Sequence, residues 1–292
     1  MVTLCHEFQS DLYPFTSHYL DINGFKMHYI DEGSGPPFLM LHGNPTWSFF
    51  YRNIIKEISS THRCIAPDHL GCGLSDKPQN YQYNLQNHLD NIIYLIEQLN
   101  ITKFNLIVHD WGGTIGMGLA GLYPDKINKI IVLNSTAFVD PDIPKRINIL
   151  RLPLLGEIAI RKFNVFARYA TFMATEKGLS ETVLRGFLFP YDNYHNRIAI
   201  HRFVKDIPMT KRDSSFSLLQ EIERRLSLLK DKQMLILWGA KDFCFNVHFY
   251  NRWKAFFPDA KYYLFENGGH YLLEDEMDKI MPLIKAHIGL DS

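Results

Sequence analysis

Short apolar segments alternate with segments of helical periodicity through the first half of the chain. The apolar segments are residues 37–41, 63–67, 104–108 and 129–133. The helical patterns between them cover residues 48–59, 85–99 and 114–123. Strands that alternate with helices over short connections are typical of βαβ units, whose strands run parallel in one sheet. The sequence therefore predicts an α/β fold.

The remaining segments complete the predicted sheet. An Asn-Gly pair at 23–24 separates two segments of alternating hydrophobicity and predicts a β-hairpin. Strand patterns also occur at 234–238 and 262–265, before a last helix near 272–288. With 292 residues, 46% of them hydrophobic, the chain can bury one large core.

The middle of the chain contains no strand pattern. Residues 138–228 show helical spacing instead, clearest at 164–174 and 218–229. We therefore expect a core domain formed by residues 1–137 and 229–292, with a helical lid of residues 138–228 inserted after the sixth strand. Open parallel sheets bind ligands at the carboxyl ends of their strands, so the lid is expected to cover a site there.

Charge and cysteine content limit the class of protein. Lys and Arg balance Asp and Glu at 31 each, so net charge gives no reason to expect nucleic acid or an anionic membrane as partner. The four cysteines lack the spacing of a disulfide framework or a metal site, which suits a cytoplasmic protein. The first 15 residues do not resemble a signal peptide, and no apolar run reaches the length of about 18 residues that a membrane span needs.

Asp110 lies at the junction between the strand pattern 104–108 and the helix pattern 114–123, in the sequence IVHDWGG. A nucleophile elbow has this strand–turn–helix arrangement and needs small neighbours, which Gly112 and Gly113 supply. Val108 occupies a position where the pattern usually has glycine. The alternative is that Asp110 only caps the helix.

Two further residues support the interpretation of Asp110 as a nucleophile. Asp242 and His270 each follow a predicted strand, and Gly-Gly precedes His270. Nucleophile, acid and histidine occur in this order in α/β-hydrolases, and strand ends place all three at one sheet edge. Asp140, after the sixth strand, is a second candidate for the acid.

A fourth element follows the strand at 37–41, in the sequence HGNP. Glycine at 43 allows the backbone to turn close to a ligand. The amides of Asn44 and Trp111 are expected to form an oxyanion hole. The alternative is that the sequence forms an ordinary turn.

An aspartate nucleophile restricts the chemistry. Attack of a carboxylate on an ester would give a high-energy anhydride, whereas attack on a saturated carbon gives a stable ester to the enzyme. The substrate is therefore expected to carry a halide, an epoxide oxygen or a lactone oxygen on a saturated carbon. His270 would then deprotonate a water that attacks the ester, and Asp242 would orient the imidazole.

These motifs together resemble the haloalkane dehalogenases of the α/β-hydrolase superfamily. The resemblance rests on LHGNPT at 41–46, APDHLGCGLSDKP at 66–78, VHDWG at 108–112, Asp242 and GH at 269–270. Longer motifs resemble more specifically the third dehalogenase subfamily, which merges with the β-lactone decarboxylases of bacterial olefin biosynthesis. These motifs are DHLGCG at 68–73, GMG at 116–118, PYDNYHNR at 190–197, FVKDIP at 203–208 and DF at 242–243.

The resemblance implies an α/β-hydrolase fold with a mostly parallel, eight-stranded sheet flanked by helices. It implies Asp110, Asp242 and His270 as catalytic residues, with the Asn44 side-chain amide and the Trp111 indole binding the leaving group. No cofactor or metal is expected. Association with other hydrocarbon-synthesis enzymes is conceivable, and oligomeric state is open.

Four functions follow from these features. Our main interpretation is a haloalkane dehalogenase acting on a small apolar substrate, and the alternative is a cis-β-lactone decarboxylase. An epoxide hydrolase would need lid tyrosines, for which Tyr169, Tyr191 and Tyr194 are candidates, and a non-catalytic binding module is the fourth. The aromatic and Met side chains at 163, 166, 169, 172 and 173 are expected to form lid core and pocket lining.

Overall fold

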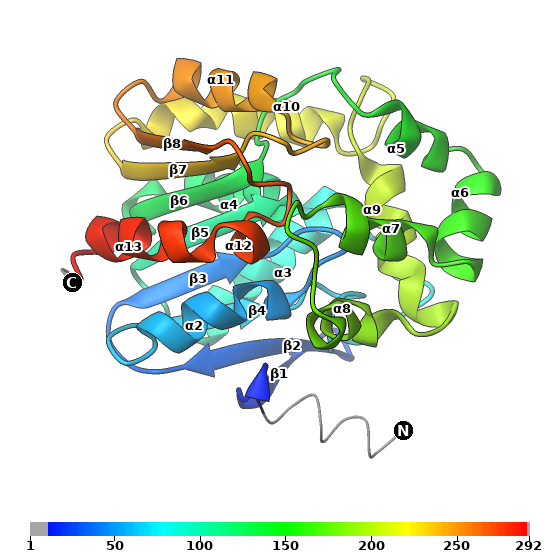
Figure 1. The fold of residues 1–292 in the computed structure, drawn as a ribbon, viewed down its shortest axis with the longest axis horizontal. Helices are drawn as coiled ribbons and strands as arrows, with labels where there is room; N and C mark the ends of the chain where they lie inside the picture. Colours follow the sequence, from blue (N-terminus) through cyan, green and yellow to red (C-terminus); the bar gives the residue numbers. More distant parts are fainter. Residues whose placement is uncertain (1–10, 291–292) are drawn as a thin grey trace.

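The computed structural model describes residues 11–290 and contains one eight-stranded sheet (Figure 1). The strand order is β1-β2-β4-β3-β5-β6-β7-β8, with β2 antiparallel to both of its neighbours and all other pairs parallel. The strands are β1 Ser17–Ile22, β2 Phe25–Glu32, β3 Pro37–Leu41, β4 Arg63–Pro67, β5 Phe104–Asp110, β6 Ile127–Ser135, β7 Gln233–Gly239 and β8 Lys261–Phe265. The predicted α/β fold and sheet are confirmed.

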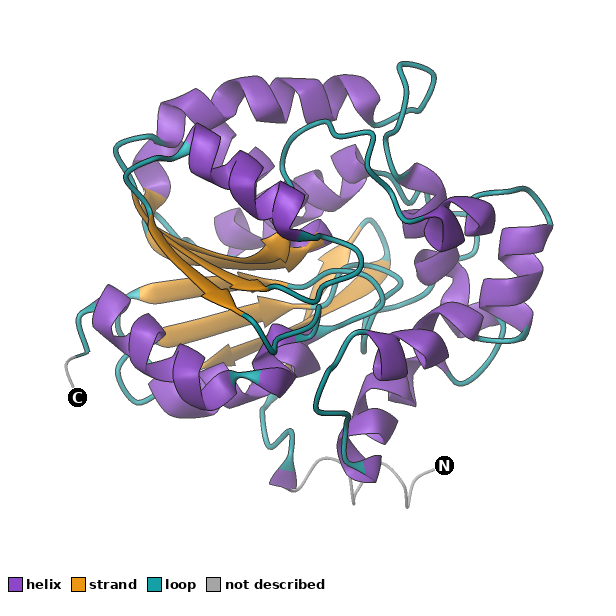
Figure 2. Ribbon diagram, turned by 45° about the horizontal axis from the view of Figure 1, so that its top comes forward, coloured by secondary structure: helices purple, strands orange, loops and turns teal. Residues whose placement is uncertain are grey.

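Helices cover both faces of this sheet and enclose a separate apolar core on each side (Figure 2). One face is covered by α3 Leu85–Gln98, α4 Trp111–Leu122, α10 Phe216–Arg225 and α11 Val247–Phe256. The other is covered by α2 Arg52–Ile58, α12 Leu272–Asp275 and α13 Met277–Ile288. Burial on both faces explains why the central strands are continuous apolar runs.

The hairpin and the last helix show how local chemistry sets the elements. Asn23 and Gly24 have φ of 52° and 88°, which suits the tight turn between two strands of right-handed twist. The predicted last helix is in fact two helices, α12 and α13, separated at Glu276. We did not predict α11.

The helical insertion lies between β6 and β7, beyond the carboxyl ends of the strands (Figure 1). It contains α5 Lys145–Leu150, α6 Leu155–Glu157, the π-helix η3 Ile158–Lys162, α7 Val165–Met173, α8 Glu181–Leu188 and α9 Ile198–Asp206. Short 3-10 turns, η4 Phe189–Tyr191 and η5 His195–Arg197, connect α8 to α9. Arg197 ties these turns together by donating to the carbonyls of Tyr191 and Asp192, both at 2.7 Å.

Helix α10 lies within the predicted lid range of 138–228 but packs against the core helix α4. A side chain at Gly118 would press against Ile222 of α10, and one at Gly121 would overlap Arg225. The predicted limits of the lid and core stay a prediction. We use "lid" below for the part from α5 to α9.

Candidate active site

Asp110 lies at the end of β5, where the chain turns sharply into α4. Its backbone has φ 52° and ψ −127°, a conformation rare for a residue with a side chain, and its carboxylate makes no helix-capping hydrogen bond. The Ser135 hydroxyl fixes the turn by donating to the Asp110 carbonyl at 2.5 Å. A side chain at Gly112 would overlap the Leu41 carbonyl. The strand–helix junction is therefore a strained elbow, not a simple helix cap.

Val108, the residue that departed from the elbow pattern, is accommodated by a glycine on the helix. A side chain at Gly116 would overlap the methyl of Val108. The small residue thus sits one helical turn into α4 instead of in the strand, and the helix still approaches β5 closely.

The histidine and the acid meet beside Asp110. The Nδ1 of His270 lies 2.7 Å from Oδ2 of Asp242, and its Nε2 lies 3.8 Å from Oδ2 of Asp110. The other oxygen of Asp242 accepts from the backbone N–H groups of Cys244 and Phe245, at 2.6 and 3.0 Å. The acid is thereby fixed in place, and it in turn orients the imidazole ring.

Burial and charge shift the pKa values of this group. Burial raises the pKa of Asp110, although the charge of His270 and the amides of Asn44 and Trp111 act against it. Burial acts to lower the pKa of His270, but the charge and hydrogen bond of Asp242 outweigh it, so the net shift is upward. A histidine with a raised pKa stays protonated to higher pH, and its positive charge is stabilised by the two nearby carboxylates.

Asp140, the second candidate for the acid, is engaged elsewhere. Its carboxylate accepts from Arg252 and His248, both at 2.8 Å. These contacts leave Asp242 as the carboxylate that contacts His270.

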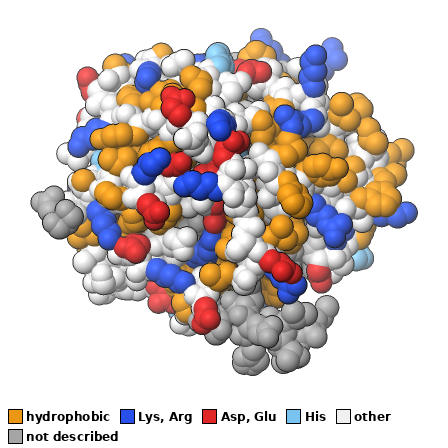
Figure 3. Space-filling view, viewed as in Figure 1, with side chains coloured by type: hydrophobic (Ala, Val, Ile, Leu, Met, Phe, Trp, Pro, Cys, Tyr) orange, Lys and Arg blue, Asp and Glu red, His pale blue; other side chains and the backbone are white. Residues whose placement is uncertain are grey.

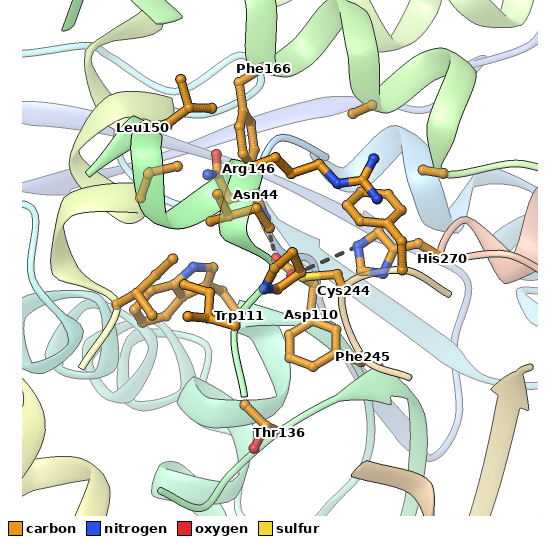
Figure 4. A pocket seen from close by; sticks show the side chains of 18 of the residues that line it. Asn44, Asp110, Trp111, Thr136, Arg146, Leu150, Phe166, Cys244, Phe245 and His270 are labelled. Carbon is orange, nitrogen blue, oxygen red and sulfur yellow. Dashed lines mark hydrogen bonds and ion pairs between the residues drawn. The ribbon is translucent and has the colours of Figure 1, made fainter. Parts of the chain in front are cut away.

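The backbone amide of Asn44, one of the two predicted oxyanion-hole donors, points at Asp110. The amide of Asn44 donates to Oδ1 of Asp110 at 2.6 Å, and a side chain at Gly43 would overlap that carboxylate. The Asn44 side chain donates to the Ile200 carbonyl at 3.2 Å, so one of its two amide hydrogens is already used. Trp111 lines the cavity beside Asn44 (Figure 4).

A cavity of about 560 Å³ opens above Asp110, between the sheet and the lid. Figure 4 shows Asn44, Trp111 and His270 around the carboxylate, with lid side chains above them. Most of the wall is apolar, including Ile147, Leu150, Val165, Phe166, Ala170, Met173, Val204, Leu219, Phe243 and Phe245. A wall of this kind suits an apolar ligand.

Three of the wall residues that sequence reasoning did not assign to the site lie close to His270 or carry a charge. Arg146, on α5, lies over the ring of Phe243 at 4.7 Å, and that ring lies 6.4 Å from the ring of His270. The ring of Phe245 stacks on His270 at 5.8 Å. Phe243 and Phe245 follow Asp242 in the same loop, so the strand-end signal could have included them. Nothing in the sequence pattern singles out Arg146 among the lid cations.

Two of the three tyrosines considered for epoxide chemistry lie outside the cavity lining. The Tyr191 hydroxyl donates to the Thr46 carbonyl, and that of Tyr194 donates to Glu157. Tyr169 lines the cavity. The structure thus does not bring together the three lid tyrosines that the epoxide interpretation relied on.

Two of the aromatic residues assigned to lid core point outward instead. Phe163 and Phe172 are 59% and 72% exposed, whereas Phe166 and Met173 line the cavity as predicted. Within residues 11–290, no three His, Cys, Asp or Glu side chains gather as a metal site, and no helix is long and apolar enough to cross a membrane. Cys64, Cys72 and Cys244 are unpaired, and Cys5 lies outside the described residues.

Comparisons with known proteins identify the family. Residues 36–277 match the family model described as alpha/beta hydrolase fold. The chain therefore belongs to the α/β-hydrolase fold family, and the prediction that it is an enzyme of this family is confirmed.

Individual relatives indicate which groups of α/β-hydrolases this chain resembles. A cis-3-alkyl-4-alkyloxetan-2-one decarboxylase of Shewanella oneidensis is 42% identical, over 94% of this chain and 88% of the relative. Haloalkane dehalogenase 2 of Mycobacterium tuberculosis is 31% identical, over 95% of this chain and 96% of the relative. The structure of a putative ancestral haloalkane dehalogenase superposes with a TM-score of 0.86 at 26% identity, over 93% of this chain and 98% of that one. The predicted resemblance to both groups is confirmed, and the comparisons favour our alternative over our main interpretation.

Proposed function

We propose that this enzyme decarboxylates cis-β-lactones that carry two alkyl chains. The observation that carries the proposal is Arg146 on the wall of an apolar cavity whose nucleophile is a carboxylate. Displacement of a lactone oxygen releases a carboxylate, which an arginine binds well, whereas a halide leaving group gains nothing specific from a planar donor. The 42% identical relative, a decarboxylase of dialkyl oxetanones, supports the same substrate class.

The first step is displacement at the ring carbon that bears the lactone oxygen. An oxygen of Asp110 bonds to this carbon as the ring C–O bond breaks, and the electron pair leaves with oxygen as a carboxylate. The amide of Asn44 holds Asp110 for attack at 2.6 Å. We propose that the Asn44 side chain, Trp111 and Arg146 bind the new carboxylate.

The second step restores the enzyme. The bond between the carboxylate carbon and its neighbour breaks and releases CO₂, and its electron pair forms the C=C bond. The ester C–O bond breaks at the same time, so Asp110 recovers its carboxylate with both original oxygens. This sequence consumes no water, so His270 acts here by its charge and not as a base.

A haloalkane dehalogenase would differ at the second step. There His270 takes a proton from water, the water attacks the ester carbonyl, and one water oxygen remains in Asp110. The same trio of Asp110, His270 and Asp242 serves both reactions, which is why it does not separate them.

An experiment in H₂¹⁸O separates the two. The enzyme is supplied with a cis-dialkyl β-lactone, alkene is measured by NMR at 25 °C, and the Asp110 peptide is weighed after one turnover. We expect alkene without ¹⁸O in the peptide, and no alkene with Asp110→Asn. Bromide release from 1-bromoalkanes at a kcat/KM of about 10⁴ M⁻¹s⁻¹ or more, without alkene from lactone, would instead establish a dehalogenase.

The cellular setting is also proposed. Three unpaired cysteines among residues 11–290 support work in the cytoplasm. Association with other enzymes of hydrocarbon synthesis would suit a substrate with two alkyl chains, since such a lactone dissolves poorly in water.

A further inference from the structure

Exposed apolar side chains concentrate on the outside of the lid. Eight large ones lie between residues 149 and 172, and Figure 3 shows hydrophobic atoms gathered over α5, α6 and α7. They are Ile149, Leu152, Leu154, Leu155, Ile158, Phe163, Phe172 and Tyr169, the last of which also lines the cavity. Single exposed hydrophobic residues are ordinary, but a contiguous group of this size marks an interaction surface.

The outermost of these side chains are strongly exposed. Leu154 is 74% exposed and Phe172 is 72% exposed. Leu154 also has φ of 62°, an unfavourable conformation for a leucine, at the turn between α5 and α6. The backbone therefore presents this leucine to the exterior instead of folding it into the lid.

The same segment is positively charged, although the chain as a whole is neutral. Residues 143–175 contain six Lys and Arg and one acid, Glu157, which gives a net charge of +5. Glu157 is paired with Arg161 at 2.9 Å. Four of the cations are exposed: Lys145, Arg146, Lys162 and Arg168. The balance of charge over the full sequence concealed this local excess.

We propose that the outer lid surface binds the surface of an anionic phospholipid bilayer. Apolar side chains surrounded by Lys and Arg are the features of interfacial membrane-binding segments, which sit at the boundary of headgroups and acyl chains. Lipid fits better than a protein partner, because the core of a protein interface is depleted of lysine, whereas here Lys145 and Lys162 are exposed in the same segment as the apolar side chains. The proposal concerns the outer surface and does not depend on the reaction proposed above.

The inner face of α5 and α7 lines the cavity, which suggests a reason for membrane binding by the outer face. Ile147 and Leu150 of α5, with Phe166 and Met173 of α7, line the cavity, while their helical neighbours Ile149 and Phe172 face outward. A bilayer at the lid would thus lie one helix away from the cavity for an apolar substrate.

The test is co-flotation of the full chain with lipid vesicles. We expect binding to vesicles of phosphatidylcholine with about 30% phosphatidylglycerol, weaker binding as salt rises, and little binding to phosphatidylcholine alone. Leu152→Gln should weaken binding at least fivefold, whereas Leu228→Gln, at a position equally exposed at 52% but outside the lid, should change it less than twofold. Lys162→Glu should weaken binding more than tenfold, and Lys103→Glu should not.

Three results would overturn the proposal. One is no preference for anionic vesicles, and another is equal loss in the lid and control variants. The third is a dimer in sedimentation velocity that Leu152→Gln dissociates, without vesicle binding, because a second copy would then cover the surface. Unchanged melting temperature and unchanged turnover of a short, water-soluble substrate show that each variant is folded. Vesicle binding is measured without substrate, so a wrong assignment of the reaction would leave this result intact.

Discussion

Replacing His270 should distinguish the two ways in which an alkyl-enzyme can react further, which are hydrolysis of the ester and release of an alkene. Nε2 of His270 lies 3.8 Å from Asp110, too far for a direct hydrogen bond, whereas the amide of Asn44 holds the same carboxylate at 2.6 Å. Loss of the imidazole therefore leaves the nucleophile in position. The first displacement should slow by no more than about tenfold, which is one lost charge interaction of about 1.4 kcal/mol.

Hydrolysis of the ester should respond far more strongly. A positioned general base contributes about 10² to 10⁴ in rate, and no other base contacts Asp110 among the described residues. With a 1-bromoalkane, His270→Ala should release about one bromide per enzyme and then stop, with an alkyl group on Asp110 in the intact mass. With a cis-β-lactone, the same variant should keep producing alkene.

The variant needs a structural control, because Asp242 is buried and loses its partner. His270→Gln retains an amide that can donate to Asp242 but cannot accept a proton, so it should behave like His270→Ala at higher stability. Sustained bromide turnover in either variant above a tenth of wild type would refute the role of His270. Loss of alkene formation by more than 10² in the glutamine variant would refute the water-free second step.

Three other predictions follow from the same geometry. Because the pKa of His270 is raised, hydrolysis of an alkyl-enzyme should fall as pH drops through a value above 6.5. Single-turnover alkene formation needs no base, so it should fall only with protonation of Asp110, whose pKa is raised by burial. Stopped-flow pH profiles measure both. Arg146→Gln should lower kcat/KM for the lactone about tenfold and spare the bromide burst, with Lys145→Gln, which lies outside the cavity lining, as matched control. Glu274→Ala leaves Arg52 buried without the carboxylate that it contacts at 2.6 Å, and should lower the free energy of unfolding in urea by about 3–5 kcal/mol. Glu181→Ala breaks an exposed ion pair and should lower it by less than about 1 kcal/mol. Equal losses in the two variants would contradict the argument from burial.

The sheet could be predicted from the sequence because its strands are buried on both faces. Continuous apolar runs mark β3, β4, β5, β6 and β7, and the predicted bounds agree with the structure to within two residues. The candidate catalytic positions followed from the same signal, since residues that end parallel strands meet at one edge. Val108 obscured the elbow pattern because its compensating Gly116 lies eight residues away, where a motif confined to the turn does not reach.

The lid was harder to predict because its helices do not have one polar face. Periodicity locates a helix by the contrast between an apolar stripe and a solvated one. In α7, Phe166 and Met173 face the cavity while Phe172 faces outward, so apolar residues occur around the helix. We assigned all of them to the interior because, in an ordinary soluble domain, an apolar side chain in a helix is buried.

The apolar residues on the outer side of the lid also bear on function. A helix that separates an apolar cavity from water would be expected to keep a polar outer face, because exposing Leu154 and Phe172 gains nothing for folding. Polar residues at these positions would stabilise the isolated chain at least as well. Apolar residues there are better explained by contacts that the isolated chain does not make. The exposed cations Lys162 and Arg168 of the same segment favour a contact that is both apolar and negatively charged, which is the chemistry of an anionic bilayer surface.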